Sequence, residues 1–575
     1  MINPVGRVIR AVSVALLLLA QVPVLAQIPV PDYWSGLVTL RTTDPLGAPT
    51  YFAPIHASVL PDGRVALMGY SKPSLLTVGS GTPVAGVLTP SPWSQIPPPD
   101  SVIVPRGNNA LDVEYYEDSR YIVRDSLFCS GHSLLPDGRL LTVGGTRYLI
   151  DKQNAITYVL GLPYSILFDG TTWRRGANHT GTAQLNYPFR WYSTATRLAS
   201  GRVLATSGYD LAEAVYNPTG QIIPGTQLRN RSVESYDPGA EAWTVLSSHA
   251  ASPPEIFNYD YSHVFQLPLD VEPGKDVLVL GNPGIPVLFA PTGEPRWTVR
   301  AGSPRPGAGG DSGHGVSSAL LPIRLADGEW GYSNGSVLLA GGRHDTDYEH
   351  GVDVYDPRAN TWLPRTELGV RRHHPMTVLL PDARLLVLAG HDDVSPENPE
   401  VRHAQLVDTA NGRAVYRGTA EVPERRGYHA VSVLLPDGRV LVAGGRDGGT
   451  DSLEQEKPTL RYYYPWYFAY QAYRLRITAA PAAISYGAAF TVDYTAHLPP
   501  PYSSVVTEAA LIGLGSMTHS FDANQRHVQL AVQAGAASVV VTAPPDGKAA
   551  PPGHYMLVLL DQYRIPSEAR IVKLE

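Results

Sequence analysis

The residue types best suited to metal and redox chemistry gather in four short segments of this sequence. These are Phe128-Cys129-Ser130-Gly131-His132, Arg190-Trp191-Tyr192, Gly427-Tyr428-His429 and Met517-Thr518-His519-Ser520. Two imidazoles and two phenolates, from His429, His519, Tyr192 and Tyr428, would make a nitrogen and oxygen site that suits copper better than zinc or calcium. We therefore predict one copper ion held by these four side chains.

Cys129 is the single cysteine among 575 residues, so no intramolecular disulfide can form. A lone cysteine is most often an inert part of the core. The chemical alternative is a bond from its sulfur to the ring carbon beside the hydroxyl of Tyr192, which makes that phenol easier to oxidise. Tyr192 and Cys129 could then hold one oxidising equivalent while copper holds another, and no organic cofactor is needed.

A repeated phrase surrounds these segments and predicts the elements that position them. Each copy has apolar residues, a Pro-Asp-Gly-Arg type of turn, more apolar residues and a final Gly-Gly or a relic of it. The copies cover residues 56–69, 132–145, 193–208, 381–390 and 436–445, and weaker ones surround Pro273-Gly274 and Asn334-Gly335. Each predicts a β-hairpin. The terminal glycines mark places where one backbone approaches another.

A second element, a strand followed by a turn and a Trp, lies at 233–243 and 352–362 and more faintly at 166–173. Hairpin and second element together make a four-stranded blade, and Gly-Gly with spaced Tyr and Trp is typical of kelch repeats. We predict an all-β protein with a seven-bladed kelch-type β-propeller over 28–469, whose long loops carry function. Short alternating strands over 470–575 predict an immunoglobulin-like β-sandwich that lacks the usual cysteines.

The composition and charge of the chain argue against a nucleic-acid partner. The net charge is −7 and only 17% of residues are charged, while Gly and Pro number 54 and 52. No basic run indicates nucleic-acid binding. Residues 1–26 have the pattern of a cleavable signal peptide, so we expect a secreted protein. The apolar part of this segment is too short to span a membrane. We also expect a monomer. An uncleaved anchor is the alternative.

The ordered set of motifs resembles the copper radical oxidases, the galactose oxidase and glyoxal oxidase group, over nearly the whole mature chain. Phe128-Cys129-Ser130-Gly131 is similar to the family's thioether cysteine motif, and Tyr192 follows an Arg by two residues like the radical tyrosine. Tyr428-His429 and His519, ahead of Asn524-Gln525-Arg526, match the remaining ligands. Residues 551–557 look like a strand of the family's C-terminal sandwich.

The resemblance implies a role for each residue. His429, His519 and Tyr192 would bind copper in the equatorial plane, with Tyr428 axial and acting as general base. The Cys129–Tyr192 thioether would carry the radical. The implied reaction oxidises a glyoxal-type aldehyde or a primary alcohol and reduces dioxygen to hydrogen peroxide. Carbohydrates are among the candidate substrates.

One position departs from galactose oxidase, where a Trp stacks over the thioether. Here that position is Asp210, beside Tyr209. Galactose-type specificity is therefore not expected, and the Arg190-Trp191-Tyr192 context is closer to glyoxal oxidases. Trp191 or Tyr209 is the candidate for the missing aromatic neighbour.

Other interpretations stay open at this stage. Adjacent residues of a regular strand face opposite sides, so Tyr428 and His429 can share a metal only where the chain is irregular. A secreted kelch module that only binds carbohydrate or protein is the rival function. A glycosidase would need a pair of carboxylates that the sequence does not offer. We expect the remaining polar motifs to line a channel, a blade edge or a turn; they are His132, His373-His374, Asp392-Asp393 and Asp169.

Overall fold

The computed structural model describes residues 32–575 apart from a set of internal segments. Those outside the description are 44–48, 70–73, 77–87, 91–113, 118–119, 154–155, 181–188, 217–227, 258–260, 282–283, 304, 306–314, 326–331, 334, 345–346, 349–350, 365, 393–398, 410–412, 423, 448–455, 498–503 and 536. The predicted signal peptide also lies outside the described residues. No helix in the described part of the chain is long and apolar enough to cross a bilayer.

Each repeat of the sequence forms an antiparallel strand pair, as its turn chemistry predicts. The pairs are β5 (His56–Val59) with β6 (Val65–Met68), β11 (Gly131–Leu134) with β12 (Leu140–Val143), β17 (Thr194–Arg197) with β18 (Val203–Thr206), β23 (His263–Gln266) with β24 (Val277–Leu280), β27 (Val316–Leu320) with β30 (Val337–Gly341), β36 (Met376–Leu379) with β37 (Leu385–Leu388), and β40 (Ala430–Leu434) with β41 (Val440–Gly444).

Two further strands extend most of these pairs to four-stranded sheets. The added strands are β15 (Tyr164–Phe168) and β16 (Trp173–Asn178), β21 (Val233–Asp237) and β22 (Ala242–Ser247), β25 (Pro286–Phe289) and β26 (Trp297–Val299), and β38 (His403–Asp408) and β39 (Arg413–Glu421). In the sheet of β40 and β41 they are β42 (Thr459–Tyr464) and the N-terminal β1 (Tyr33–Trp34), so the two ends of the predicted propeller share one sheet. A fifth strand of this sheet, β2 (Val38–Thr39), also pairs with β42.

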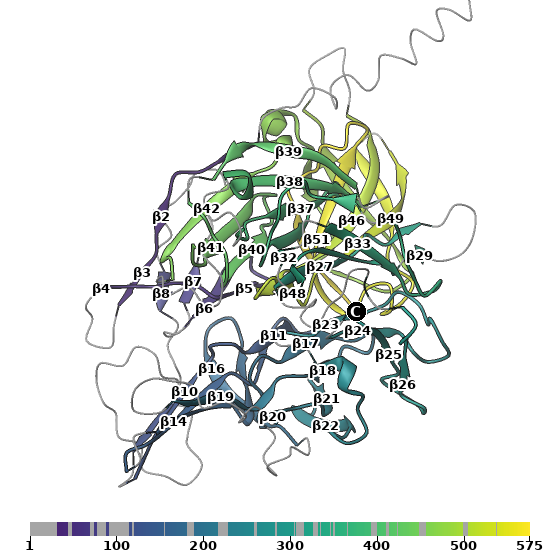
Figure 1. The fold of residues 1–575 in the computed structure, drawn as a ribbon. Helices are drawn as coiled ribbons and strands as arrows, with labels where there is room; N and C mark the ends of the chain where they lie inside the picture. Colours follow the sequence, from purple (N-terminus) through teal and green to yellow (C-terminus); the bar gives the residue numbers. More distant parts are fainter. Residues whose placement is uncertain are drawn as a thin grey trace, which may run out of the picture.

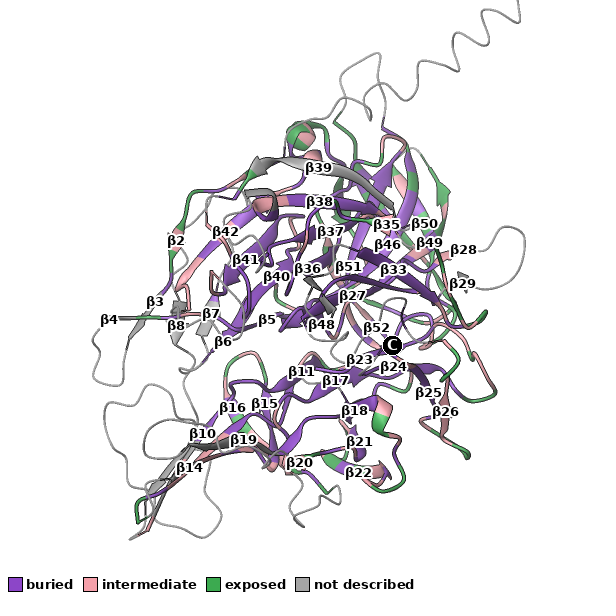
Figure 2. Ribbon diagram, in the orientation of Figure 1, coloured by how far each residue is buried: buried purple, intermediate pink, exposed green. Residues whose placement is uncertain are grey.

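A larger sheet combines two more four-strand arrays. It holds β5 and β6 with β7 (Ser74–Leu76) and β8 (Leu88–Pro90), and β27 and β30 with β33 (Gly351–Asp356) and β34 (Thr361–Trp362). Figure 1 shows the sheets following one another around the molecule, and Figure 2 shows their inner strands as buried. The all-β class is confirmed, while the number of seven blades stays a prediction.

Glycines end the inner hairpins where backbones meet. A Cβ on Gly144 would lie 2.1 Å from the carbonyl oxygen of Arg190, and one on Gly444 would lie 1.9 Å from that of Pro54. Neither space admits any side chain. The interpretation of the Gly-Gly pair as a point of backbone approach therefore holds at both positions.

One region predicted as loops contains strands. A six-stranded sheet runs through β9 (Glu114–Glu117), β10 (Tyr121–Ser126), β13 (Thr146–Asp151), β14 (Ile156–Gly161), β19 (Tyr209–Tyr216) and β20 (Leu228–Arg229). Its strands lie next to the inner hairpins in sequence: β10 precedes Cys129, β13 follows β12, and β19 follows β18. The connections of these repeats are long because they form this extra sheet.

The C-terminal part forms an eight-stranded sheet system. Its order is β43 (Arg476–Ala479), β45 (Ala489–Thr495), β50 (Ser538–Thr542), β49 (His527–Ala534), β46 (Val506–Gly513), β51 (Gly553–Asp561), β52 (Arg570–Leu574) and β44 (Ala483–Ile484). Its core merges with that of the preceding sheets, since Tyr555 and Leu557 belong to the same buried cluster as Phe265 and Leu278. The boundary at 469/470 stays a prediction.

A short hairpin leaves this C-terminal sheet and enters the propeller-like part. β47 (Ser516–Thr518) pairs antiparallel with β5, and β48 (Phe521–Asp522) pairs in parallel with β27. The hairpin thereby joins the two four-strand arrays of the larger sheet, near the centre of Figure 1. His519 lies at its tip, between the two strands.

Candidate metal centre

Four of the predicted site residues have the left-handed backbone conformation. The φ angles are 57° at Cys129, 61° at Tyr192, 68° at His429 and 43° at His519. Cys129 and Tyr192 each stand two residues before an inner strand, and His429 immediately precedes β40. Such angles are uncommon outside glycine and break the alternation of strand side chains. The irregularity that Tyr428 and His429 need in order to face one site is therefore present.

The five predicted side chains come together in the interior. One ligand atom each of Cys129, His429 and His519 lies within 4.8 Å of the others, and all three residues are buried. The Sγ of Cys129 is 3.6 Å from Nε2 of His519. The hydroxyls of Tyr192 and Tyr428 are hydrogen-bonded at 2.5 Å. Their rings lie 5.1 and 5.4 Å from that of His519, centroid to centroid.

Glu456 orients the imidazole of His429. Its Oε1 is 2.5 Å from Nδ1 of His429 and accepts a second hydrogen bond of 2.7 Å from Nε of Arg446. Burial raises the pKa of Glu456, but the hydrogen bond and charge of His429 and Arg446 outweigh it, so the pKa lies below its usual value. The carboxylate keeps the proton on Nδ1, which leaves Nε2 as the ligand atom.

His519 is held in a similar way by its neighbour. Its Nδ1 lies 2.7 Å from the hydroxyl of Thr518, so Nε2 is the atom that faces Cys129. Burial, followed by the proximity of His429, holds the pKa of His519 well below its ordinary value. The ring is neutral at physiological pH, as a metal ligand must be.

A second pair of histidines, His56 and His132, packs next to the Cys129 segment. Nε2 of His56 accepts the backbone N–H of Cys129 at 3.1 Å. The ring of His132 lies 5.2 Å from that of His56, and its Nδ1 is bonded to the hydroxyls of Ser58 and Ser516. His132 thus joins three strands, β5, β11 and β47, and burial lowers its pKa to about 3. It belongs to the scaffold of the site.

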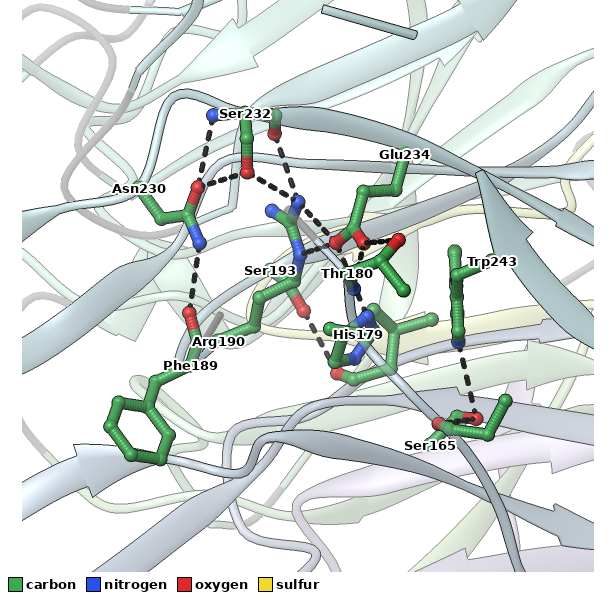
Figure 3. Close-up of polar contacts among 12 residues, drawn as sticks. Ser165, His179, Thr180, Phe189, Arg190, Ser193, Asn230, Ser232, Glu234 and Trp243 are labelled. Atoms are coloured by element: carbon green, nitrogen blue, oxygen red, sulfur yellow. Dashed lines mark hydrogen bonds and ion pairs between the residues drawn. The ribbon is translucent and has the colours of Figure 1, made fainter. Parts of the chain in front are cut away.

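Arg190 anchors the segment that carries Tyr192. Its guanidinium is fully buried and binds Glu234 Oε2 through Nε and Nη2 at 3.0 and 2.8 Å. It also donates to the carbonyl oxygen of Ser207. A further hydrogen bond goes to the carbonyl oxygen of Ser232 (Figure 3). Glu234 accepts the backbone N–H of Thr180 as well. This buried ion pair holds in place the backbone that leads into β17 and carries Tyr192.

Aromatic rings enclose Tyr192. Trp191 meets it edge to face with centroids 4.3 Å apart, and Tyr261 does so at 5.5 Å. Tyr209 pairs with Trp191 through the backbone, its ring 6.0 Å away. Asp210, at the position of the family's stacking Trp, accepts a hydrogen bond from Asn230 instead. Trp191 is therefore the aromatic neighbour of Tyr192 at this side.

The remaining polar motifs fall outside the five-residue cluster. His373 and His374 stack on one another at 4.1 Å and are buried, with His374 only 4.8 Å from the ring of Tyr428. Asp392 is buried, and Asp393 lies outside the described residues. Asp169 accepts the N–H groups of Thr171 and Thr172 and so forms a turn.

The donor set fits a copper ion. Two imidazoles, two phenols and one thiol converge in a buried space, and imidazole with anionic oxygen suits copper. Both imidazoles have their other nitrogen occupied by a hydrogen-bond partner, which fixes the ligand nitrogen in advance.

Comparisons with known proteins agree with this chemistry. Residues 474–574 match the galactose oxidase-like early set domain. The chain is 26% identical over 403 residues to the aldehyde oxidase GLOX1 of Arabidopsis thaliana, covering 64% of this chain and 61% of that one. It is 36% identical over 160 residues to the aldehyde oxidase GLOX of Vitis pseudoreticulata, covering 26% and 30%. These similarities support the copper radical oxidases as the family that the chain resembles.

Two further proteins show how far the similarity extends along the chain. Galactose oxidase of Gibberella zeae is 23% identical, with 79% of this chain and 61% of that one covered. The chain thus spans less than two thirds of the length of these relatives. A solved fungal alcohol oxidase of the AA5 family, in complex with copper, has the same fold with a TM-score of 0.63, 18% identity, and coverage of 94% and 99%.

The sequence interpretation missed several residues that the structure places at the site. Glu456, Arg446 and His56 hold the candidate ligands, and Tyr261 packs on Tyr192 and His519. His56 opens the first repeat and was visible there as the start of a hairpin. Glu456 has no such signal, because it lies 27 residues from His429 in a segment without a repeat.

Proposed function

We propose that the chain is a secreted copper radical oxidase that oxidises an aldehyde of the glyoxal type or a primary alcohol. For an aldehyde, RCHO + H2O + O2 gives RCOOH + H2O2, and for an alcohol, RCH2OH + O2 gives RCHO + H2O2. The observation that carries this proposal is the pair of phenol oxygens 2.5 Å apart beside a buried thiol and two imidazoles. In our proposal His429, His519, Tyr192 and Tyr428 hold the copper.

When bound, copper supplies a Lewis acid that acidifies the substrate hydroxyl and a one-electron acceptor. Tyr428 accepts the proton of that hydroxyl as the general base. The hydrogen bond between the two phenols keeps the hydroxyl oxygen of Tyr428 next to that of Tyr192. Tyr192, joined to Cys129, takes the hydrogen atom from the substrate carbon.

The scaffold explains why this chemistry would be confined to one place. Cys129, Tyr192 and Tyr428 are 0%, 8% and 5% exposed, so the radical is shielded from bulk water. Trp191 and Tyr261 cover the ring of Tyr192 from two sides. Because Asp210 is turned to Asn230, we propose an aldehyde rather than galactose as the preferred substrate, in line with the names of the plant relatives.

The cross-link is the decisive test of this function. It replaces the S–H bond of Cys129 and a ring C–H bond of Tyr192 by one C–S bond, while dioxygen takes the two hydrogens as hydrogen peroxide. After incubation with copper and air, tryptic mapping should find the two peptides joined and two hydrogens lighter than their sum. Cys129→Ser should fold, bind copper and give no joined peptide and no turnover.

The rival function is a kelch module that only binds carbohydrate or protein, and it predicts no cross-link. Copper-loaded wild-type protein with separate Cys129 and Tyr192 peptides would support it. A substrate panel read through a peroxidase-coupled dye then distinguishes aldehydes from primary alcohols, and Cys129→Ser serves as the blank in every assay.

A further inference from the structure

Two buried arginines meet where the C-terminal part joins the inner strands. Arg197 is the last residue of β17, and Arg526 immediately precedes β49. They are 5% and 4% exposed. Burial lowers the pKa of Arg526 to about 10, and the charge of Arg197 adds to this effect. Two like charges therefore share one water-poor region.

No described carboxylate forms an ion pair with either of these two arginines. Arg526 donates to the backbone carbonyls of Gln266 and Lys548. Arg197 donates through Nη2 to the phenol of Tyr555 at 3.3 Å, while its Nε and Nη1 are buried with no acceptor among the described residues. A buried charge without a counter-charge is costly, so such donors call for an anion.

A cavity of about 30 Å³ lies between these groups. Both guanidiniums line it together with Gln266, Asp522, Asn524 and Pro551. Nδ2 of Asn524 is another buried donor with no acceptor in the described part of the chain. Roughly 10–15 Å³ of such space holds one water molecule, so the cavity has room for a single small ion or two waters.

The charges around the cavity point to a monovalent ion. Asp522 is the one carboxylate on the described lining, and its Oδ1 is already engaged by the N–H groups of Ser516 and Asn524. Two guanidiniums against one carboxylate leave a net charge of +1.

We propose that this cavity binds a small inorganic monoanion of the halide class, with chloride as the physiological ion. The ion accepts hydrogen bonds from Arg197 and Asn524 and neutralises the charge shared with Arg526. It ties β17 to the turn 522–526, which follows the hairpin that carries His519. The site is separate from the candidate copper centre and requires no redox step.

Bromide is the direct probe of this site. Crystals of the full chain grown or soaked in sodium bromide should show an anomalous peak at the bromine edge, within hydrogen-bond distance of Arg197 and Arg526. A cavity that contains only water under these conditions, with no anomalous signal, overturns the proposal. This measurement uses the unaltered chain and does not depend on any variant folding.

Thermal unfolding gives an independent test in solution. With ionic strength held constant by sodium gluconate, chloride should raise Tm by about 1 °C per tenfold increase above its Kd, because it binds only the folded state. Arg197→Met should abolish this dependence. Arg202→Met, on the same hairpin but paired with the exposed Asp237, is the control and should keep it. Equal chloride dependence in both variants contradicts the site.

Discussion

Around the candidate centre, strained backbone and buried side chains occur at the same residues. Cys129, Tyr192, His429 and His519 all have positive φ, a conformation that costs about 1–3 kcal/mol per residue and persists only where packing enforces it. Their side chains leave the regular strands and converge on one point. The residue types of the site can be predicted from sequence, but no sequence signal predicts positive φ at a tyrosine or a histidine.

Tyr428→Phe tests the proposed base. We expect copper to remain bound, because His429, His519 and Tyr192 are unchanged, while kcat falls by about 10²–10⁴-fold, the usual contribution of a general base. The measurement is turnover across pH combined with copper content. Tyr473→Phe, at an exposed ring, is the control. An unchanged pH profile in Tyr428→Phe would exclude Tyr428 as the base.

Glu456→Gln tests the support of His429. The amide keeps an oxygen near Nδ1 but loses the charge that holds the proton there, so we expect copper affinity to fall by about 10–100-fold. Competition with a chelator of known affinity measures this without turnover. Glu241→Gln is the control; it removes the charge of a more exposed carboxylate that pairs with Arg139 and Arg174 and touches none of the candidate ligands. Equal copper affinity in the two variants would show that the charge of Glu456 has no such role.

Among the elements, the inner hairpins were predictable because each has its own turn signal. Gly63, Gly138 and Gly438 have φ angles of 83°, 92° and 95°, as the Pro-Asp-Gly-Arg turn requires. The six-stranded sheet of β9, β10, β13, β14, β19 and β20 was not predicted. Some of its strands pair over long distances in sequence, such as β14 with β19, where Leu160 pairs with Leu211, 51 positions further along, and local patterns do not encode such pairing.

One copy of the turn places an alanine where the others have glycine. Ala383 has a φ of 65°, which costs about 1–2 kcal/mol for an L side chain. Ala383→Gly removes this cost, while the greater freedom of glycine in the unfolded chain returns about 0.4–1 kcal/mol of it. We expect a net gain of about 0.5 kcal/mol, measured as a higher Tm.

The equivalent turn of another repeat provides the comparison. Ala199 stands at the first position of its turn and is absent from the residues with positive φ, which Gly201 provides there. Ala199→Gly should therefore lower Tm. A fall in Tm for Ala383→Gly as well would mean that lost packing of the methyl group outweighs the relief of strain.

For the whole molecule, the contact between the C-terminal hairpin and the inner strands joins the two parts of the chain and brings His519 to the candidate site. Composition and repeats predict both parts of the chain, but they do not predict that residues 516–522 leave one part and pair with β5 and β27 of the other. This contact spans more than 400 residues of sequence, from Ser58 to Ser516. Only the position of His519 in an ordered set of motifs suggested that the two parts meet.

Asp522 makes this contact sensitive to pH. Burial raises the pKa of Asp522 to about 6, above its usual value of 3.8. The protonated form is favoured in the folded state, so this contribution to stability is complete below about pH 4 and is lost as the pH rises through 6. The shift corresponds to on the order of 2–3 kcal/mol.

Asp522→Asn should remove this dependence, since the amide oxygen can still accept the N–H groups of Ser516 and Asn524. We expect the Tm of the wild type to fall relative to that of Asp522→Asn between pH 4 and pH 7. Asp493→Asn, at an exposed position of β45, should follow the wild type. Parallel curves for the wild type and Asp522→Asn would refute the assignment.

The long separation of the candidate ligands in sequence has a consequence for biosynthesis. His519 follows Cys129 by 390 residues, yet the two side chains lie side by side in the folded protein. A nascent polypeptide therefore lacks the full donor set until residue 519 has been synthesised. Metal capture and any oxygen chemistry are thereby deferred until the inner strands and the C-terminal hairpin can fold together.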